Sequence, residues 1–180
     1  MTLTFHPSSK LQERRLLAQP WEARAAQMDQ SISFSPRAKT YTRLNSVPLL
    51  LDEDYERLRD CGIAIEEDAA QRFLVFKSVK LGGQTYTAPE CDILVVIPPN
   101  YPQAGNDMLW TYPRLRRADG RPIPATLDPA GGDNRTYQGC EFCRWSRHWT
   151  APPGLWRPGK DDVMTIWRRI EWAMQNPDCQ

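Results

Sequence analysis

Two cysteines, two arginines and a histidine lie close together near the C-terminal end of the sequence. In chain order they are Cys140, Cys143, Arg144, Arg147 and His148. Positive charges beside a thiol stabilise its thiolate, which is the nucleophilic form of the side chain. The segment therefore predicts a covalent site in which a cysteine attacks a carbonyl group. Three tryptophans in the same segment are expected either to line this site or to be ordinary core residues.

The same side chains also match part of a zinc site. Cys140, Cys143 and His148 have the spacing of the first three ligands of a zinc knuckle, Cys-x2-Cys-x4-His. A structural zinc ion takes four protein ligands, and the position of the fourth is occupied by Pro153. Asp133 or a distant cysteine would have to complete the site. We therefore expect no metal here, and a small zinc-binding module stays as an alternative to the covalent site.

Composition and charge restrict the class of protein. The chain has 180 residues, of which 41% are hydrophobic and 25% are charged, so it can bury one sizeable core. A net charge of +1 gives no general attraction to nucleic acid or membranes, and the arginines between 114 and 121 are expected to face a protein. The sequence shows no long apolar run and no signal segment, and its five cysteines, an odd number, favour reduced thiols. We therefore expect a cytoplasmic protein that contacts neither nucleic acid nor membrane.

Charge divides the chain into two parts. Residues 1–45 contain seven lysine or arginine residues and three aspartate or glutamate residues. This segment also includes Trp21, Phe34 and Tyr41, which are unusual in a disordered tail. We expect residues 1–45 to be a basic arm that docks on a partner protein, and residues 46–180 to form the folded domain.

The periodicity of the domain predicts a helix, four strands and a final helix. The first helix ends at Gly62, and the last one begins at Asp161 or Asp162 and is ended by Pro177. The proline-rich stretch between the last strand and the last helix is expected to be mostly irregular. We predict an α+β fold in which a four-stranded antiparallel meander packs against both helices. The predicted segments are 47–61, 63–65, 72–81, 91–97, 108–112 and 161–177.

Two stretches resemble a known family. Residues 97–110, IPPNYPQAGNDMLW, resemble a strand, the tyrosine-proline corner and the following strand of ubiquitin-conjugating enzymes. Residues 155–170, LWRPGKDDVMTIWRRI, resemble that family's Trp-Ser-Pro motif and the helix after it. The resemblance covers about residues 48–175 and extends to a bacterial ubiquitin-conjugating-enzyme-like group. It implies an operon that also encodes a ThiF-like activating enzyme, a ubiquitin-like protein and a JAB-type protease.

The resemblance also implies which residues carry the reaction. Cys143 is the first choice of nucleophile because it follows Phe142 shortly after Gly139, as in the family's Gly-x-Ile-Cys, and Cys140 is the alternate. His148 would deprotonate the thiol or, later, the incoming amine. Both cysteines lie further from the Trp-x-Pro motif than the family's cysteine does, so we expect an insertion in the intervening loop.

One residue of the family's pattern is missing. The family's His-Pro-Asn tripeptide, whose asparagine assists attack on the thioester, is replaced by Tyr-Pro-Arg at residues 112–114. Either His148, Ser146 or Asn134 supplies the missing donor, or the acceptor chemistry differs. A third alternative is a protein that keeps the fold and binds a modifier but has lost the chemistry.

The function implied by the resemblance is that of a conjugating enzyme. Such a protein accepts a ubiquitin-like modifier from the activating enzyme as a cysteine thioester and passes the modifier to an amine. This chemistry requires no cofactor. The operon association suggests a bacterial conjugation pathway linked to antiphage defence.

Overall fold

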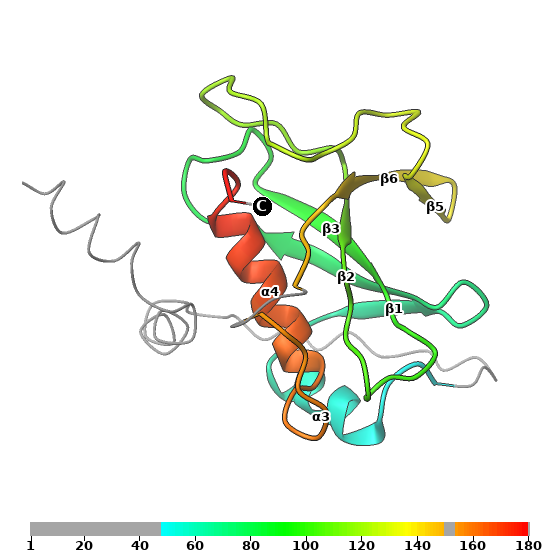
Figure 1. Cartoon of the computed structure of the whole chain (residues 1–180). Coiled ribbons are helices and arrows are strands. Elements are labelled where there is room, and N and C mark those ends of the chain that lie inside the picture. Colours follow the sequence, from blue (N-terminus) through cyan, green and yellow to red (C-terminus); the bar gives the residue numbers. More distant parts are fainter. Residues whose placement is uncertain (1–47, 150–153, 180) are drawn as a thin grey trace, which may run out of the picture. The chain divides into compact units, whose positions relative to one another are not determined.

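The computed structural model describes residues 48–149 and 154–179 (Figure 1). These residues form the α+β structure that the sequence predicts, with two helices and six strands. The predicted arm, residues 1–45, lies outside the described residues. In chain order the elements are α3 (Asp52–Asp60), β1 (Ile65–Asp68), β2 (Phe73–Lys80), β3 (Glu90–Val96), β4 (Leu109–Tyr112), β5 (Arg135–Tyr137), β6 (Cys140–Trp145) and α4 (Val163–Gln175).

The strands form one antiparallel sheet in the order β1-β2-β3-β4-β6-β5. The prediction of four strands was incomplete, because β6 pairs with β4 and β5 pairs with β6. Both added strands come from the stretch that was expected to be mostly irregular. The sheet also curls, since the hydroxyl group of Tyr137 on β5 donates a hydrogen bond of 3.3 Å to Glu66 on β1.

A tight turn explains why the cysteine segment is a hairpin. Tyr137 pairs with Cys140, and only Gln138 and Gly139 lie between them. Gln138 has φ 50° and Gly139 has φ 76°. Two successive residues in the left-handed region match a type I′ turn, whose twist suits the two strands it joins. The turn therefore places Cys140 and Cys143 on a strand instead of a loop.

Helix α4 is capped and amphipathic, as predicted. Of the two predicted caps, Asp162 holds the position, and its carboxylate accepts hydrogen bonds from the backbone nitrogens of Met164 (2.8 Å) and Thr165 (3.2 Å). The helix lies against one face of the sheet (Figure 1). Its fully buried apolar residues are Val163, Ile166, Ile170 and Ala173.

Helix α3 is joined to α4 through a buried carboxylate. Asp54 is 2% exposed and accepts hydrogen bonds from the hydroxyl group of Tyr101 (2.6 Å) and the backbone nitrogen of Val163 (3.3 Å). Leu58, on the same helix, is completely buried in the core. Asp54 thus connects both helices and the tyrosine-proline corner.

The two faces of the sheet bury separate clusters. The face that carries α4 contributes alternate residues such as Leu74, Phe76 and Leu109 to the main core. The opposite face holds a smaller cluster, which the curl of the sheet encloses. Its buried members are Phe73, Val75, Leu94, Trp110, Tyr137 and Phe142.

Trp156 connects the two stretches that resemble ubiquitin-conjugating enzymes. Its Nε1 donates to the carbonyl oxygen of Pro102 at 2.9 Å, and its ring lies 6.0 Å from that of Tyr101. The same ring covers Gly105, where an added Cβ atom would lie 2.1 Å from Cε3 of the indole. Only glycine leaves room for the ring at this position.

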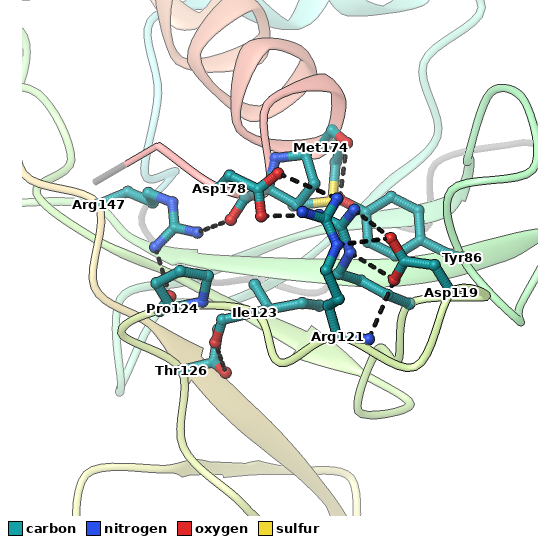
Figure 2. Close-up of polar contacts among 11 residues, drawn as sticks. Tyr86, Asp119, Arg121, Ile123, Pro124, Thr126, Arg147, Met174 and Asp178 are labelled. Carbon is teal, nitrogen blue, oxygen red and sulfur yellow. Dashed lines mark hydrogen bonds and ion pairs between the residues drawn. The ribbon is translucent and has the colours of Figure 1, made fainter.

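Three side chains form hydrogen bonds with the last turn of α4 and the residues after it (Figure 2). The hydroxyl group of Tyr86 donates to the carbonyl oxygen of Met174 at 2.6 Å. Arg117 bonds Asp178 at 2.8 Å, and Arg147 donates to the carbonyl oxygen of Pro177 at 3.0 Å. These contacts hold the C-terminal segment against three separate stretches of chain: the β2–β3 connection, the β4–β5 connection and the segment that follows β6.

Candidate active site

Cys143, the first choice of nucleophile from the sequence, is shielded inside the sheet. It pairs with Thr111 of β4 and is 2% exposed, and its sulfur lies 3.9 Å from Nδ2 of Asn134. Burial raises the pKa of Cys143, Glu141 raises it further, and Arg114 partly opposes them. In this conformation the thiol is protonated at neutral pH and covered from a protein-sized substrate.

The two arginines expected to activate a thiol have other contacts. Arg144 forms an ion pair with Asp133. Arg147 is 1% exposed, lies over the ring of Trp145 at 5.0 Å, and donates to backbone carbonyl oxygens, including that of Pro124 at 3.1 Å. Both arginines therefore have a structural role, because they bind loop residues to β6 and to the segment that follows it.

Cys140, the alternate, is the partly exposed thiol of β6. It begins the strand and packs at the edge of the smaller cluster. Cys140 is the main cause of a raised pKa of Tyr112, so the phenol lies close enough to the thiol to interact with it. A phenol with a raised pKa stays protonated at neutral pH and can donate to the sulfur. Tyr112 is 38% exposed, so the pair can be reached from solvent.

Tyr112 is a residue that the sequence reasoning missed. It occupies the first position of the altered His-Pro-Asn tripeptide, where only the absence of asparagine was noted. Its ring lies 5.5 Å from that of Phe142, which fixes it beside β6. The pairing of β4 with β6 brings Tyr112 to Cys140, and no local signal in the sequence predicts that pairing.

His148 lies at the other end of β6 and forms a separate group. Its Nε2 is 2.8 Å from Oγ of Ser146, and its Nδ1 is 3.0 Å from Oδ1 of Asp107. A strand rises about 3.3 Å per residue, so the ends of β6, Cys140 and Trp145, lie roughly 17 Å apart. His148 follows beyond Trp145, and the structure therefore does not bring it to Cys140.

The remaining candidates for the missing donor are also separated. Ser146 contacts His148 instead of a thiol. Asn134 is next to Cys143, but it also donates to the carbonyl oxygen of Asp128 (2.8 Å) and to Glu141 (2.7 Å). These bonds hold the loop before β5, which is a structural role.

The strand geometry does not favour the zinc alternative. Residues three apart on a strand point to opposite faces, so the sulfurs of Cys140 and Cys143 do not converge on one ion. Within residues 48–149 and 154–179, no group of three or more histidine, cysteine, aspartate or glutamate side chains has an arrangement that could hold a metal ion.

The tyrosine-proline corner and the motif around Trp156 contact each other in an α+β fold, as the resemblance to ubiquitin-conjugating enzymes implies. The chain belongs to Prokaryotic E2 family E, whose family model matches residues 50–177. This confirms the resemblance to bacterial ubiquitin-conjugating-enzyme-like proteins. Membership indicates a conjugating function with a ubiquitin-like protein and an activating enzyme as partners in general. No curated protein and no solved structure matches the chain. Within the part of the chain that the structure describes, no helix is long and apolar enough to cross a membrane.

Proposed function

We propose that the protein carries a ubiquitin-like modifier as a thioester and transfers it to an amine. A cysteine thiolate attacks the carbonyl carbon that joins the modifier to the activating enzyme. The new carbon–sulfur bond forms as the old one breaks, and the thiolate of the activating enzyme leaves. An amine then attacks the same carbon and loses a proton to water, a carbon–nitrogen bond forms, the carbon–sulfur bond breaks, and the cysteine is released as a thiolate. Family membership and the thiol-bearing strand support this proposal.

Cys140 is the nucleophile that the geometry supports best. The observation that carries this choice is its partly exposed side chain on β6, which lies close enough to the phenol of Tyr112 to raise the pKa of that phenol. A donor beside the sulfur stabilises the thiolate. Cys143 remains the alternate, but strand β6 would have to open before a modifier could reach it.

Tyr112 supports the reaction in place of the missing asparagine. The phenol is a hydrogen-bond donor next to the reacting sulfur, so it is close to the carbonyl oxygen of a thioester formed there. Negative charge develops on that oxygen in the transition state, and a fixed donor stabilises it. His148, at the far end of β6, is not needed for this step.

A charging reaction tests the nucleophile. The protein is mixed with its activating enzyme, modifier and ATP, and the products are separated on a nonreducing gel. Cys140→Ala should remove an adduct that reductant cleaves, and Cys140→Ser should convert it to an ester that survives reductant but not hydroxide. Loss of the adduct in Cys143→Ala alone would move the site to Cys143. Normal charging of the double variant would overturn both assignments.

A modifier-binding protein without chemistry is the second candidate. The burial of Cys143 and the missing asparagine favour it. It predicts that the modifier binds, with one copy per protein, while no adduct forms even with an active activating enzyme. Isothermal titration calorimetry, run beside the charging reaction, separates the two functions.

The basic arm and the cellular setting belong to the same proposal. We assign residues 1–45 to docking on the ThiF-like activating enzyme and residues 46–180 to a domain with the ubiquitin-conjugating fold. Deleting the arm should weaken the complex with the activating enzyme and leave thermal unfolding unchanged. Loss of the fold on deletion would show that the arm belongs to the core.

We place the pathway in the bacterial cytoplasm, in antiphage defence.

A further inference from the structure

Ser146, His148 and Asp107 form a chain of hydrogen bonds. The distance from Oγ of Ser146 to Nε2 of His148 is 2.8 Å, and that from Nδ1 of His148 to Oδ1 of Asp107 is 3.0 Å. A carboxylate only accepts, so Nδ1 carries the proton and Nε2 is left to accept from the serine hydroxyl group. This order of donors and acceptors is the one that activates serine nucleophiles.

We propose that Ser146, His148 and Asp107 form a second acyl-transfer site, in which Ser146 attacks activated acyl groups such as thioesters and esters. Arg147, which lies between Ser146 and His148, fixes the backbone that carries them. Arg147 is buried and donates to the carbonyl oxygens of Pro124 and Pro177 (Figure 2). Arg147 is buried, whereas Ser146 is partly exposed and His148 is exposed. The two neighbours of Arg147 therefore lie on the outside, where their side chains meet.

A second buried arginine, Arg169, holds the residues next to Asp107 and His148. Nη1 of Arg169 donates to the backbone oxygen (3.0 Å) and to Oδ1 (3.3 Å) of Asn106, which precedes Asp107. The same guanidinium group lies 5.1 Å from the ring of Trp149, which follows His148. One buried group therefore fixes the chain beside both Asp107 and His148. Support of this kind distinguishes a built site from a chance contact between flexible surface residues.

The site can be reached by a large substrate. The side chains of His148 and Asp107 are 51% and 53% exposed, and Ser146 is partly exposed. Water competes with hydrogen bonds at this exposure, so the gain in reactivity is smaller than in a buried site. The substrates that fit are therefore acyl groups that are already activated, such as thioesters.

The proposed step conserves atoms and charge. Oγ of Ser146 attacks the carbonyl carbon while its proton moves to Nε2 of His148. The bond from carbon to the leaving sulfur or oxygen breaks, and the leaving group takes that proton from His148. The acyl group stays on Ser146 as an ester until an amine or water attacks it. Asp107 holds the charged imidazole during the transfer.

A fluorophosphonate probe tests the site. Such a probe phosphonylates an activated serine with loss of fluoride. Mass spectrometry of the labelled full-length protein should place the label on Ser146, and Ser146→Ala should remove it. His148→Ala and Asp107→Ala should each slow the labelling by roughly 10-fold or more, which is less than the ~100-fold of a typical acid–base partner because water screens this exposed site. Ser78→Ala, which alters an exposed serine on β2, is the matched control and should label at the wild-type rate.

The outcomes separate this proposal from the thioester function. Labelling of Ser146 should persist in Cys140→Ala, because the two sites lie at opposite ends of β6. A protein that forms no thioester but labels on Ser146 would overturn only the function proposed for the thiol. No labelling of Ser146, or equal rates in wild type and in a folded His148→Ala variant, would show an ordinary surface hydroxyl group. Circular dichroism confirms the fold of each variant.

Discussion

The phenol of Tyr112, at the end of β4, interacts with the thiol of Cys140, at the start of β6, and this interaction raises the pKa of the phenol. These two residues come from separate parts of the sequence and meet only because β6 pairs with β4. The contact gives the thiol a nearby hydrogen-bond donor. It also places the donor at the position where the family's tripeptide is altered.

Replacing Tyr112 by Phe tests this contact. The variant keeps the ring packing on Phe142 but removes the donor to the sulfur. We expect Cys140 to be alkylated by iodoacetamide about 3- to 10-fold more slowly at neutral pH, because its thiolate loses a hydrogen-bond donor. The measurement is pulse alkylation followed by peptide mass spectrometry. An unchanged rate at Cys140 would mean that the phenol does not stabilise the thiolate.

The five thiols should react in an order set by their exposure. Cys61 and Cys179 are exposed, Cys140 is partly exposed, and Cys91 and Cys143 are buried. Burial also raises the pKa of the two buried thiols. We expect Cys61 and Cys179 to be alkylated first, Cys140 next, and the buried pair on the order of 10-fold later or more, since they need local opening. In urea all five should react alike. Fast native labelling of Cys143 would contradict its placement in the sheet.

Gly105 offers a test of the link between the two family stretches. An alanine there would put its Cβ atom 2.1 Å from the ring of Trp156, so Gly105→Ala must displace the indole. We expect a loss of about 1–3 kcal/mol in the free energy of unfolding, measured with urea, and a change in tryptophan fluorescence. Gly82→Ala is the matched control, because an added Cβ atom meets nothing within 4 Å there. Equal stability of the two variants would argue against this packing.

Arg169 should be a strong contributor to stability. Burial lowers its pKa to about 10, so it remains charged at neutral pH. Its guanidinium group lies 5.1 Å from the ring of Trp149 and 5.3 Å from that of Trp156, and it donates to Asn106. We expect Arg169→Ala to lower the free energy of unfolding by about 2–3 kcal/mol, because buried carbonyl oxygens lose their donor.

The neighbouring residue provides the control for Arg169. Arg168 is exposed on the same helix, and Arg168→Ala should stay within about 0.5 kcal/mol of the wild type. Urea unfolding of both variants measures the difference. If both cost the same, the effect comes from helix propensity and not from the buried contacts of Arg169.

The sequence predicted the elements whose signals are local. The cap at Asp162 and the end of α4 before Pro177 depend on neighbours within one helical turn, and the structure places them there. The run at 93–97 is apolar because β3 is covered on both faces, and the structure has β3 at Glu90–Val96. The family resemblance rested on short motifs of the same kind.

The sequence alone therefore determined the α+β class, the capped final helix and the stretch that contains the candidate site residues. Only the tertiary structure decided which of those side chains meet. A strand pairing between β4 and β6 buries Cys143, exposes Cys140 beside Tyr112, and leaves His148 with Ser146 and Asp107. Strand partners are chosen by packing and by the register between segments far apart in the chain, so no local pattern could predict these contacts.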